Sequence, residues 1–214
     1  MMIETPCVTR KTRTVNEQTK LSSDWGDSIA NTITPFSCED RIVGRLSESL
    51  ALACGTEPTM AKLIGRAATL HDVGKFQVPT TILNKPAGLS PCEYKAMKTH
   101  TIWGANLLMQ LPNDCGYKDL ARDIAIWHHE KYDGSGYWGR RTNDLPYFVH
   151  IVTLCDVYTA LTSSRPYKHA WTKEEALEHI AVQSGKQFSP ILAHTFIKLM
   201  REGGNNGEPT FLMK

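Results

Sequence analysis

The segment IWHHEKYDGSGYWG, residues 126–139, places two adjacent histidines at the end of a run with helical periodicity. His128 and His129 each lie four positions after an apolar residue, so both continue faces that a helix turns toward a protein core. Neighbouring residues on a helix diverge by about 100°. The pair can therefore serve two metal ions, or two shells of one site, from the end of one helix.

Helical periodicity and helix-start signals run through most of the chain after residue 36. Two helix starts carry a capping box, Ser90 with Glu93 and Thr172 with Glu175. No segment alternates convincingly between apolar and polar residues with a period of two. We therefore predict an all-α fold, a bundle-like helical domain. The predicted helices span residues 37–55, 58–72, 90–111, 117–130, 145–163, 172–184 and 189–200.

Length and composition favour one domain. The chain has 214 residues, 41% of them hydrophobic, and its formal net charge of +2 gives no reason to expect bulk attraction to a nucleic acid polymer. No run approaches the roughly twenty apolar residues of a membrane span, and the N-terminus lacks a secretory signal, so we expect no membrane contact and a cytoplasmic location. We expect an N-terminal extension over residues 1–30, the helical domain over 31–203 and a C-terminal tail over 204–214.

Three more ionisable residues lie on apolar helical faces. His71, His100 and Asp156 each sit on the apolar stripe of a predicted helix. A single such histidine is more often a hydrogen-bonded core residue, and Asp156 alone could pair with an arginine. Their joint placement with the histidine pair is harder to satisfy with protein partners, because burying several such groups without compensation is costly. Metal ions would compensate this cost, since imidazoles and carboxylates are metal ligands.

The residue types limit the choice of metal only in part. The six cysteines include no C-x-x-C pair, which argues against a thiolate zinc site. A set of imidazoles and carboxylates suits iron, manganese, magnesium or zinc. The identity of the metal therefore stays open at this point.

Four segments between about Pro58 and Leu199 form an ordered set of motifs. They read LHDVGKFQVPTTILNKPAGLSPCEYKAMKTHTIWGANLL, IAIWHHEKYDGSGYWG, VTLCDVYTALTSSRPYK and GKQFSP. Together they resemble the HD-GYP family, the cyclic di-GMP phosphodiesterase branch of the HD metal-dependent phosphohydrolases. The resemblance implies an HD-domain helical bundle with a metal centre in its core, spanning the domain expected over residues 31–203.

The same resemblance implies roles for individual residues. It predicts two divalent transition metals, iron or manganese first, with magnesium, zinc or nickel as alternatives. Asp72 would be catalytic, bridging the two metals with a water or hydroxide between them. Lys75 would bind non-bridging phosphate oxygens or protonate the leaving ribose oxygen, and Arg165 with Lys168 resembles the family's phosphate-binding pair. The implied metal ligands are His71, Asp72, His100, His128, His129 and Asp156.

The first predicted helix departs from the family pattern. Families of this kind often place a glutamate and a histidine there, four residues apart, and the corresponding positions fall on Pro35 and Glu39. Glu39 can replace the imidazole as a metal ligand, or it can be a first-turn glutamate that the helix dipole favours. A proline at the other position argues against a third metal, so we expect a two-metal site.

The GYP signature itself is altered, to Gly136, Tyr137 and Trp138. In the family this loop is associated with docking to GGDEF-type cyclase domains, so the resemblance implies a partner loop that includes these residues and Gly134. Trp138 lacks the fixed backbone angle of proline and adds a large ring. We expect this change to affect the choice of docking partner more than the reaction itself. Gly134 and Gly136 keep the backbone freedom of a tight loop.

The leading functional prediction is a metal-dependent phosphodiesterase that hydrolyses cyclic di-GMP to linear pGpG, with GMP as an optional further product. One alternative is a catalytically weak cyclic-dinucleotide sensor or partner-binding module, which the altered loop and first helix favour. Another is a phosphodiesterase for a mixed cyclic GMP-AMP dinucleotide, which presents the same phosphates. A general HD phosphohydrolase acting on nucleotides is disfavoured, because a minimal HD site needs neither the histidine pair nor the RPYK motif.

Overall fold

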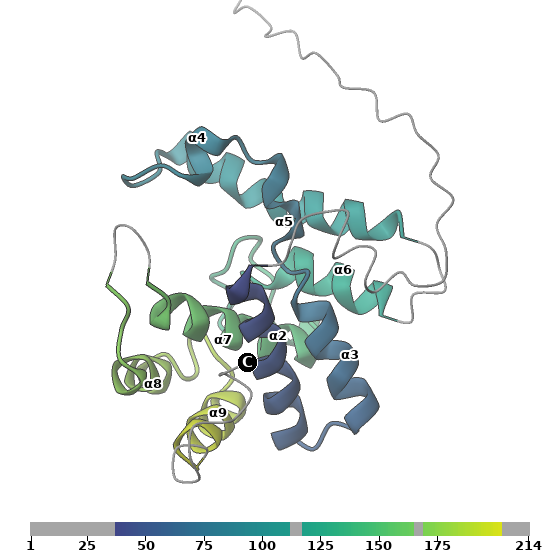
Figure 1. The fold of residues 1–214 in the computed structure, drawn as a ribbon, viewed down its shortest axis with the longest axis vertical. Coiled ribbons are helices and arrows are strands. Elements are labelled where there is room, and N and C mark those ends of the chain that lie inside the picture. Colours follow the sequence, from purple (N-terminus) through teal and green to yellow (C-terminus); the bar gives the residue numbers. More distant parts are fainter. Residues whose placement is uncertain (1–36, 112–116, 165–168, 203–214) are drawn as a thin grey trace, which may run out of the picture.

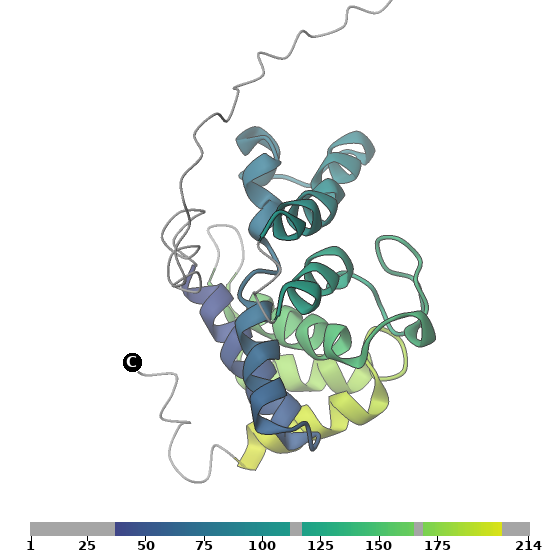
Figure 2. The ribbon, with the colours of Figure 1, turned by 90° about the vertical axis from the view of Figure 1, so that its right-hand side faces the viewer.

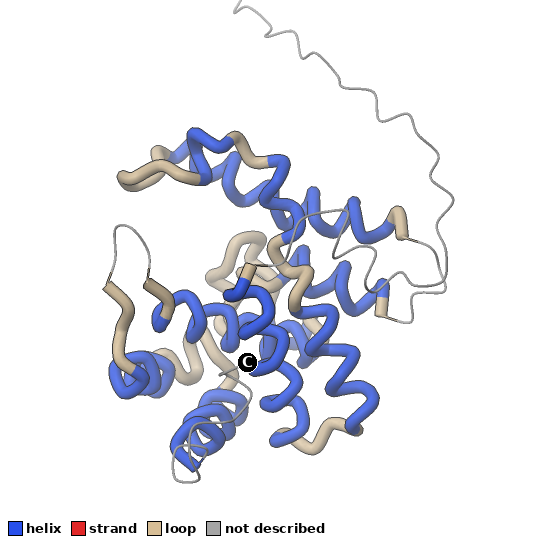
Figure 3. The backbone as a smooth tube through the Cα atoms, in the orientation of Figure 1, coloured by secondary structure: helices blue, strands red, loops and turns tan. Residues whose placement is uncertain are grey.

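The computed structural model describes residues 37–111, 117–164 and 169–202, and in these residues the fold is all-α (Figure 1, Figure 3). The described part contains no strand, only an isolated bridge between Ser184 and Phe188. The predicted fold class is confirmed. The α-helices are α2 (Cys38–Ala53), α3 (Pro58–Ala68), α4 (Thr80–Leu83), α5 (Pro91–Met109), α6 (Lys118–Trp127), α7 (Tyr147–Thr162), α8 (Lys173–Val182) and α9 (Pro190–Glu202), with 3₁₀ turns η1 (Val73–Gln77) and η2 (Thr142–Asp144) between them.

Each predicted helix is present, and the caps explain where several of them begin. The capping box at the start of α5 forms as predicted: Glu93 N donates to Ser90 Oγ over 3.3 Å, and Ser90 N donates to Glu93 Oε2 over 2.7 Å. The second predicted box caps α8. A third box, Ser37 with Asp40, caps α2 and was not predicted. The four-residue α4 was also missed, because one turn is too short to show a periodicity.

Helix α3 ends four residues earlier than the sequence predicts. After Ala68 the backbone tightens to i→i−3 hydrogen bonds, from Leu70 N to Ala67 O and from His71 N to Ala68 O. Thr69 Oγ1 donates to Arg66 O over 2.8 Å, which satisfies one of the last carbonyls of the helix. His71 therefore lies in a turn after α3 and not on the helix itself.

Helix α7 is at the centre of the bundle. It contacts α2, α6, α8 and α9, and most of its residues are buried. Helices α2 and α3 pack side by side, as do α5 and α6, while α4 and the first turns of α5 extend away from the bundle (Figure 1, Figure 2). Apolar burial is the main stabilising contribution. The largest fully buried apolar side chains are Leu46, Leu50, Ile64, Leu108, Ile124, Ile151, Leu154, Ile180 and Phe196.

A close backbone approach fixes η1 against α5. A Cβ atom added to Gly74 would lie 1.9 Å from His100 O and 2.4 Å from Gly104 N, distances that no side chain can adopt. Only glycine lets the two backbones come this close. The turn that carries Asp72 and Lys75 is thereby held beside the middle of α5.

Some predicted features fall outside the described residues. Arg165 and Lys168 lie there, as do residues 1–36 and 203–214, so the predicted domain limits at 30 and 203 stay predictions. Among the helices that are described, none has the length and apolar character that crossing a bilayer requires.

We predict that Gly74→Ala destabilises the fold by at least about 1–3 kcal/mol, because the added methyl group must push η1 away from α5. Thermal or denaturant unfolding of the purified variant measures the loss. Gly88→Ala is the matched control, since a Cβ there meets nothing within 4 Å. Equal stability of the two variants would contradict the proposed close packing.

Candidate metal centre

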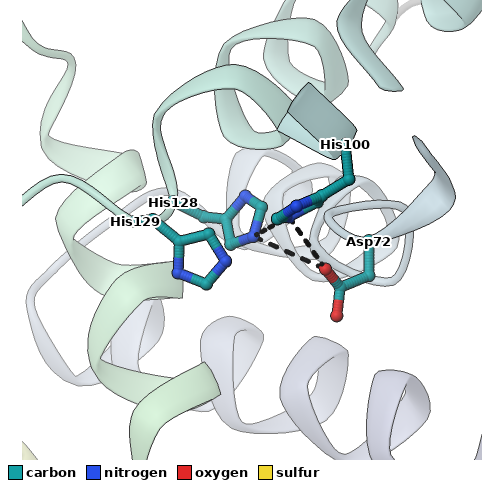
Figure 4. A group of neighbouring side chains, drawn as sticks. All are labelled: Asp72, His100, His128 and His129. Atoms are coloured by element: carbon teal, nitrogen blue, oxygen red, sulfur yellow. Dashed lines mark hydrogen bonds and ion pairs between the residues drawn. The ribbon is translucent and has the colours of Figure 1, made fainter. Parts of the chain in front are cut away.

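Four side chains that can bind a cation converge where η1, α5 and the end of α6 meet (Figure 4). Asp72 is the N-cap residue of η1, His100 lies on α5, His128 is the C-cap residue of α6 and His129 follows it. One ligand atom of each residue lies within 4.8 Å of those of the others. We call these four residues the histidine cluster.

A second group lies on the other side of Asp72. Ligand atoms of Asp40, His71 and Asp72 also lie within 4.8 Å of one another. His71 Nε2 is 3.5 Å from Asp156 Oδ1, which adds a carboxylate from α7. We call Asp40, His71, Asp72 and Asp156 the aspartate cluster.

The carboxylate of Asp72 is shared between the two clusters, one oxygen to each. Oδ1 lies 3.3 Å from His100 Nε2 and 3.7 Å from His128 Nε2. Oδ2 lies 3.2 Å from His71 Nε2 and accepts a short hydrogen bond from Lys75 Nζ. This arrangement allows one carboxylate to bind two cations, one through each oxygen.

Backbone carbonyls fix the tautomer of three of the histidines. The Nδ1 atom of His71 contacts Ala68 O at 2.8 Å, and that of His100 contacts Met97 O at 2.7 Å. The Nδ1 atom of His128 lies 3.1 Å from two carbonyl oxygens of α6. A carbonyl oxygen can only accept, so each Nδ1 must carry the proton. In the neutral form of each ring, the Nε2 atom, which points toward Asp72, is then left with a lone pair for a cation.

This geometry fits a metal better than it fits the protein alone. The Nε2 atoms of His100 and His128 face each other at 3.5 Å, and both are acceptors in the neutral rings. Asp72 Oδ1 is buried and has no hydrogen-bond partner among the described residues. Buried acceptors that converge without a donor are costly. A cation between them removes the cost, and their nitrogen and oxygen atoms suit iron, manganese, zinc or magnesium.

Protonation differs between the two clusters when no metal is bound. Burial opposes a charge on His71, but the neighbouring Asp72 and Asp156 carboxylates hold its pKa well above the usual range. Burial lowers the pKa of His128, and burial together with the repulsion that a protonated His128 would exert lowers the pKa of His129 to about 2. At neutral pH His71 therefore carries a proton on Nε2, whereas His128 and His129 are neutral.

Lys75 brings a positive charge to the aspartate cluster. Burial opposes this charge, but Asp72, Asp156 and Asp40 raise the pKa of the ammonium, so it stays protonated. Its side chain is 39% exposed. The ammonium can therefore contact both Asp72 and a ligand that enters from solvent.

The structure brings together the six residues that the resemblance implies as ligands, but it corrects where they lie. Five of them were assigned to helix faces, yet α3 ends before His71, and His128 and His129 lie at and after the end of α6. Helix ends are irregular in a way that periodicity does not report. Only His100 and Asp156 project from helix interiors.

Glu39 belongs to neither cluster in the described part of the chain, whereas its neighbour Asp40 is a member of the aspartate cluster. Adjacent residues on α2 point about 100° apart, so an error of one position in the register changes which acid faces the site. Asp40 also caps α2, because its Oδ2 accepts from Ser37 N over 2.9 Å. The sequence signal for Asp40 was its place three residues after a serine that begins a helix.

Glu130 is a site residue that the sequence analysis missed. Its side chain is buried, and its carboxylate accepts from Trp138 N over 2.6 Å and from Arg140 N over 2.8 Å. A Cβ on Gly136 would lie 2.4 Å from Glu130 Cα, so glycine is what lets the loop fold back over the helix end. Gly134, with φ of +82°, takes a left-handed turn in the same loop. The signal was an acid between the histidine pair and the glycines.

Comparison with known proteins relates the chain to a family and to named enzymes. The family model described as "HD domain" matches residues 24–192. A cyclic di-GMP phosphodiesterase from Thermotoga maritima is 39% identical over 161 residues, 75% of this chain and 43% of that protein. The 3'3'-cGAMP-specific phosphodiesterase 2 of Vibrio cholerae is 32% identical over 192 residues, 86% of this chain and 36% of that protein. The chain thus spans less than half the length of these curated relatives.

Two solved structures share the fold. An HDG"Y"P protein from Bdellovibrio bacteriovorus superposes with a TM-score of 0.62 at 21% identity, covering 82% of this chain and 56% of that one. The HD domain of the L. monocytogenes phosphodiesterase PgpH, in complex with cyclic-di-AMP, gives a TM-score of 0.56 at 19% identity, covering 85% of this chain and 96% of that one. At these identities the likeness establishes the fold alone.

We predict that metal binding releases protons and tightens as the pH rises from 6 to 8. The raised pKa of His71 means that a metal at the aspartate cluster must displace a proton, so affinity increases by up to about tenfold per pH unit until the pH exceeds that pKa. Titration calorimetry with Mn²⁺ in buffers of different ionisation enthalpy measures both effects. His71→Asn should remove the released proton, and equal affinity of the unaltered protein across this range would disprove the assignment.

Proposed function

Because the chain belongs to the HD domain family, we propose that it is a metal-dependent phosphodiesterase that hydrolyses a cyclic dinucleotide. One observation carries the proposal: the partly buried carboxylate of Asp72 offers one oxygen to each of two ligand clusters. When a phosphodiester is hydrolysed, the attacking oxygen and the leaving oxygen lie on opposite sides of phosphorus. Two neighbouring cations can stabilise the charge on both oxygens.

We propose that two divalent transition metals are held, with iron or manganese ahead of magnesium, zinc and nickel. The aspartate cluster would hold one metal, with Asp40 in the role first assigned to Glu39, and the histidine cluster would hold the other. When bound, such a pair activates water at neutral pH and stabilises charge on the attacking and leaving oxygens. The absence of cysteine from both clusters and the mixture of imidazole and carboxylate support this choice of metals.

The protein's own residues would orient the substrate. Lys75, protonated and partly exposed beside Asp72, is placed to bind a non-bridging phosphate oxygen or to donate a proton to the leaving ribose oxygen. The three imidazoles anchored by backbone carbonyls keep their rings fixed, so the ligand atoms need not reorganise during the reaction. Arg165 and Lys168, outside the described residues, remain our candidates for contacts with the second phosphate.

For the substrate we propose cyclic di-GMP, cleaved to linear pGpG with GMP as an optional further product. The name and 39% identity of the Thermotoga maritima relative support this choice. A mixed cyclic GMP-AMP dinucleotide is the second candidate, because the Vibrio cholerae relative named for that substrate aligns over 86% of this chain. Both molecules present the same pair of phosphates to the clusters.

We also propose that the loop with Gly134, Gly136, Tyr137 and Trp138 can contact a GGDEF-type cyclase in the cytoplasm. Trp138 is 39% exposed, and its ring lines an open groove of about 400 Å³. The catalytically weak sensor remains the functional alternative, since a partner-binding role does not need turnover. The other residues that line the groove are Ile102, Ile126, Trp127, Gly139, Arg140 and Asp144.

Assays of the metal-loaded protein test the proposed activity. We expect Mn²⁺- or Fe²⁺-loaded protein to convert cyclic di-GMP to the linear dinucleotide, and Asp72→Ala to abolish turnover. Chromatography of the products with cyclic di-GMP, 3'3'-cGAMP and cyclic di-AMP gives the substrate preference. Tight nucleotide binding without turnover under any of these metals would favour the sensor instead.

We predict that Lys75→Met lowers kcat by about 10²–10³-fold, because a charge next to the reacting phosphate is lost. The exposed Lys62 on α3 provides the control, and Lys62→Met should keep the rate of the unaltered protein. Steady-state kinetics separates this loss from an effect on KM. If the two lysine variants turned over equally fast, Lys75 would have no part in the reaction.

A further inference from the structure

His129, in the histidine cluster, is held differently from the other three histidines of the metal centre. The Nδ1 atoms of His71, His100 and His128 are fixed by backbone carbonyls. His129 has no such hydrogen bond within the described residues, so nothing of this kind sets the angle of its ring. An imidazole that must meet a cation at a defined angle needs another support.

The ring of Tyr137 provides a surface for His129. The two rings stack with centroids 4.3 Å apart and an interplanar angle of 30°. On the main chain, Tyr137 N donates to His129 O over 3.3 Å. Ring and backbone of Tyr137 therefore both contact His129, and the stack restricts rotation of the imidazole about its side-chain bonds.

Tyr137 is in turn fastened to α5 by Lys98. The ammonium of Lys98 donates a short hydrogen bond to Tyr137 O. The same Nζ lies 5.4 Å from the ring centre of Tyr137 and 4.8 Å from that of Trp138, within the range of cation–π contacts. One side chain of α5 thus holds two successive residues of the loop.

Trp138, the residue that departs from the GYP signature, adds two further attachments. Its Nε1 donates to the buried Thr101 Oγ1 on α5 over 3.2 Å, and its backbone N donates to Glu130 Oε1. Proline at this position could make neither bond, because it has no N–H group. The altered signature therefore gives the loop an attachment of its own to the helix that carries His100.

We propose that Tyr137, fastened to α5 by Lys98 and Trp138, is a positioning residue that sets the ring of His129 for binding a metal. Its stack replaces the carbonyl hydrogen bond that orients the other three histidines. The inference rests on the proposed metal-binding function of the histidine cluster, but it requires neither a cyclic dinucleotide substrate nor a cyclase partner.

A matched pair of variants at one position tests the stack. Tyr137→Phe keeps the aromatic ring. Tyr137→Leu keeps an apolar side chain but removes the ring. We expect Leu to weaken Co²⁺ binding at the histidine cluster about 10–100-fold, the usual effect of losing a residue that supports a ligand, while Phe stays close to the unaltered protein. Competition with a chelator measures the affinity, and circular dichroism confirms that both variants are folded.

Lys98 supplies an independent test on a neighbouring helix. Lys98→Met keeps the length of the side chain but removes its hydrogen bond and its charge, so we expect a weaker Co²⁺ affinity in the same binding step. Lys95→Met is the control, because Lys95 is exposed on the same helix and makes no hydrogen bond or cation–π contact with the loop among the described residues. Equal Co²⁺ affinities of these two variants would show that Lys98 does not hold Tyr137 in place.

The His129→Ala background separates positioning from general damage. This variant should lose affinity in one of two Co²⁺ binding steps, which identifies that step with the histidine cluster. In this background Tyr137→Leu should change the affinity by less than about twofold, because the ring that it positions is absent. If Tyr137→Leu lowered affinity equally in both backgrounds, or in neither, the inference would be wrong. Absence of dinucleotide turnover, by contrast, would count against the proposed enzyme and leave this result unaffected.

Discussion

The carboxylate of Asp72 lies among imidazoles, and one of its oxygens is buried without a hydrogen bond from the described residues; the rest of the structure depends on this constraint. Asp72 Oδ1 is 3.3 Å from His100 Nε2 and 3.7 Å from His128 Nε2, yet the Nδ1 protons of these two rings are directed at backbone carbonyls. On this side the carboxylate oxygen faces two ring nitrogens that are also acceptors in the neutral rings, and a cation between them would offset the cost of burying these groups together. The surrounding fold maintains this arrangement, since the contact of Gly74 with α5 and the short turn after α3 both place Asp72 against His100.

The sequence predicts the helices well and the clusters in outline, because apolar periodicity and capping boxes are local signals. It also indicates that imidazoles and acids from distant segments point inward. It places His71 and the histidine pair in the last residues of predicted helices but does not predict that α3 and α6 already end at Ala68 and Trp127, since the tightening to 3₁₀ bonds leaves no periodic trace. The choice between Glu39 and Asp40 depends on a rotation of about 100°, which the sequence alone cannot place. The carboxylate of Glu130 serves backbone N–H groups that become neighbours only when the loop folds back.

Trp138 attaches the loop after His129 to the rest of the protein. Trp138 supplies a backbone donor, an indole donor and a ring under Lys98, all directed at the protein itself. The same ring lines the groove beside Arg140 and is partly exposed there. The loop therefore has an inner face that contacts the histidine cluster and an outer face open to solvent. A ligand on the outer face would be one residue away from the ring that stacks on His129.

The central claim is that Asp72 joins two cation sites, and anomalous diffraction from crystals loaded with Mn²⁺ tests it most directly. The predicted result is two anomalous peaks, one beside each carboxylate oxygen of Asp72, with the first reached by His71 and Asp156 and the second by His100, His128 and His129. Crystals whose anomalous density is absent from both clusters, or that show a single ion away from Asp72, would contradict it.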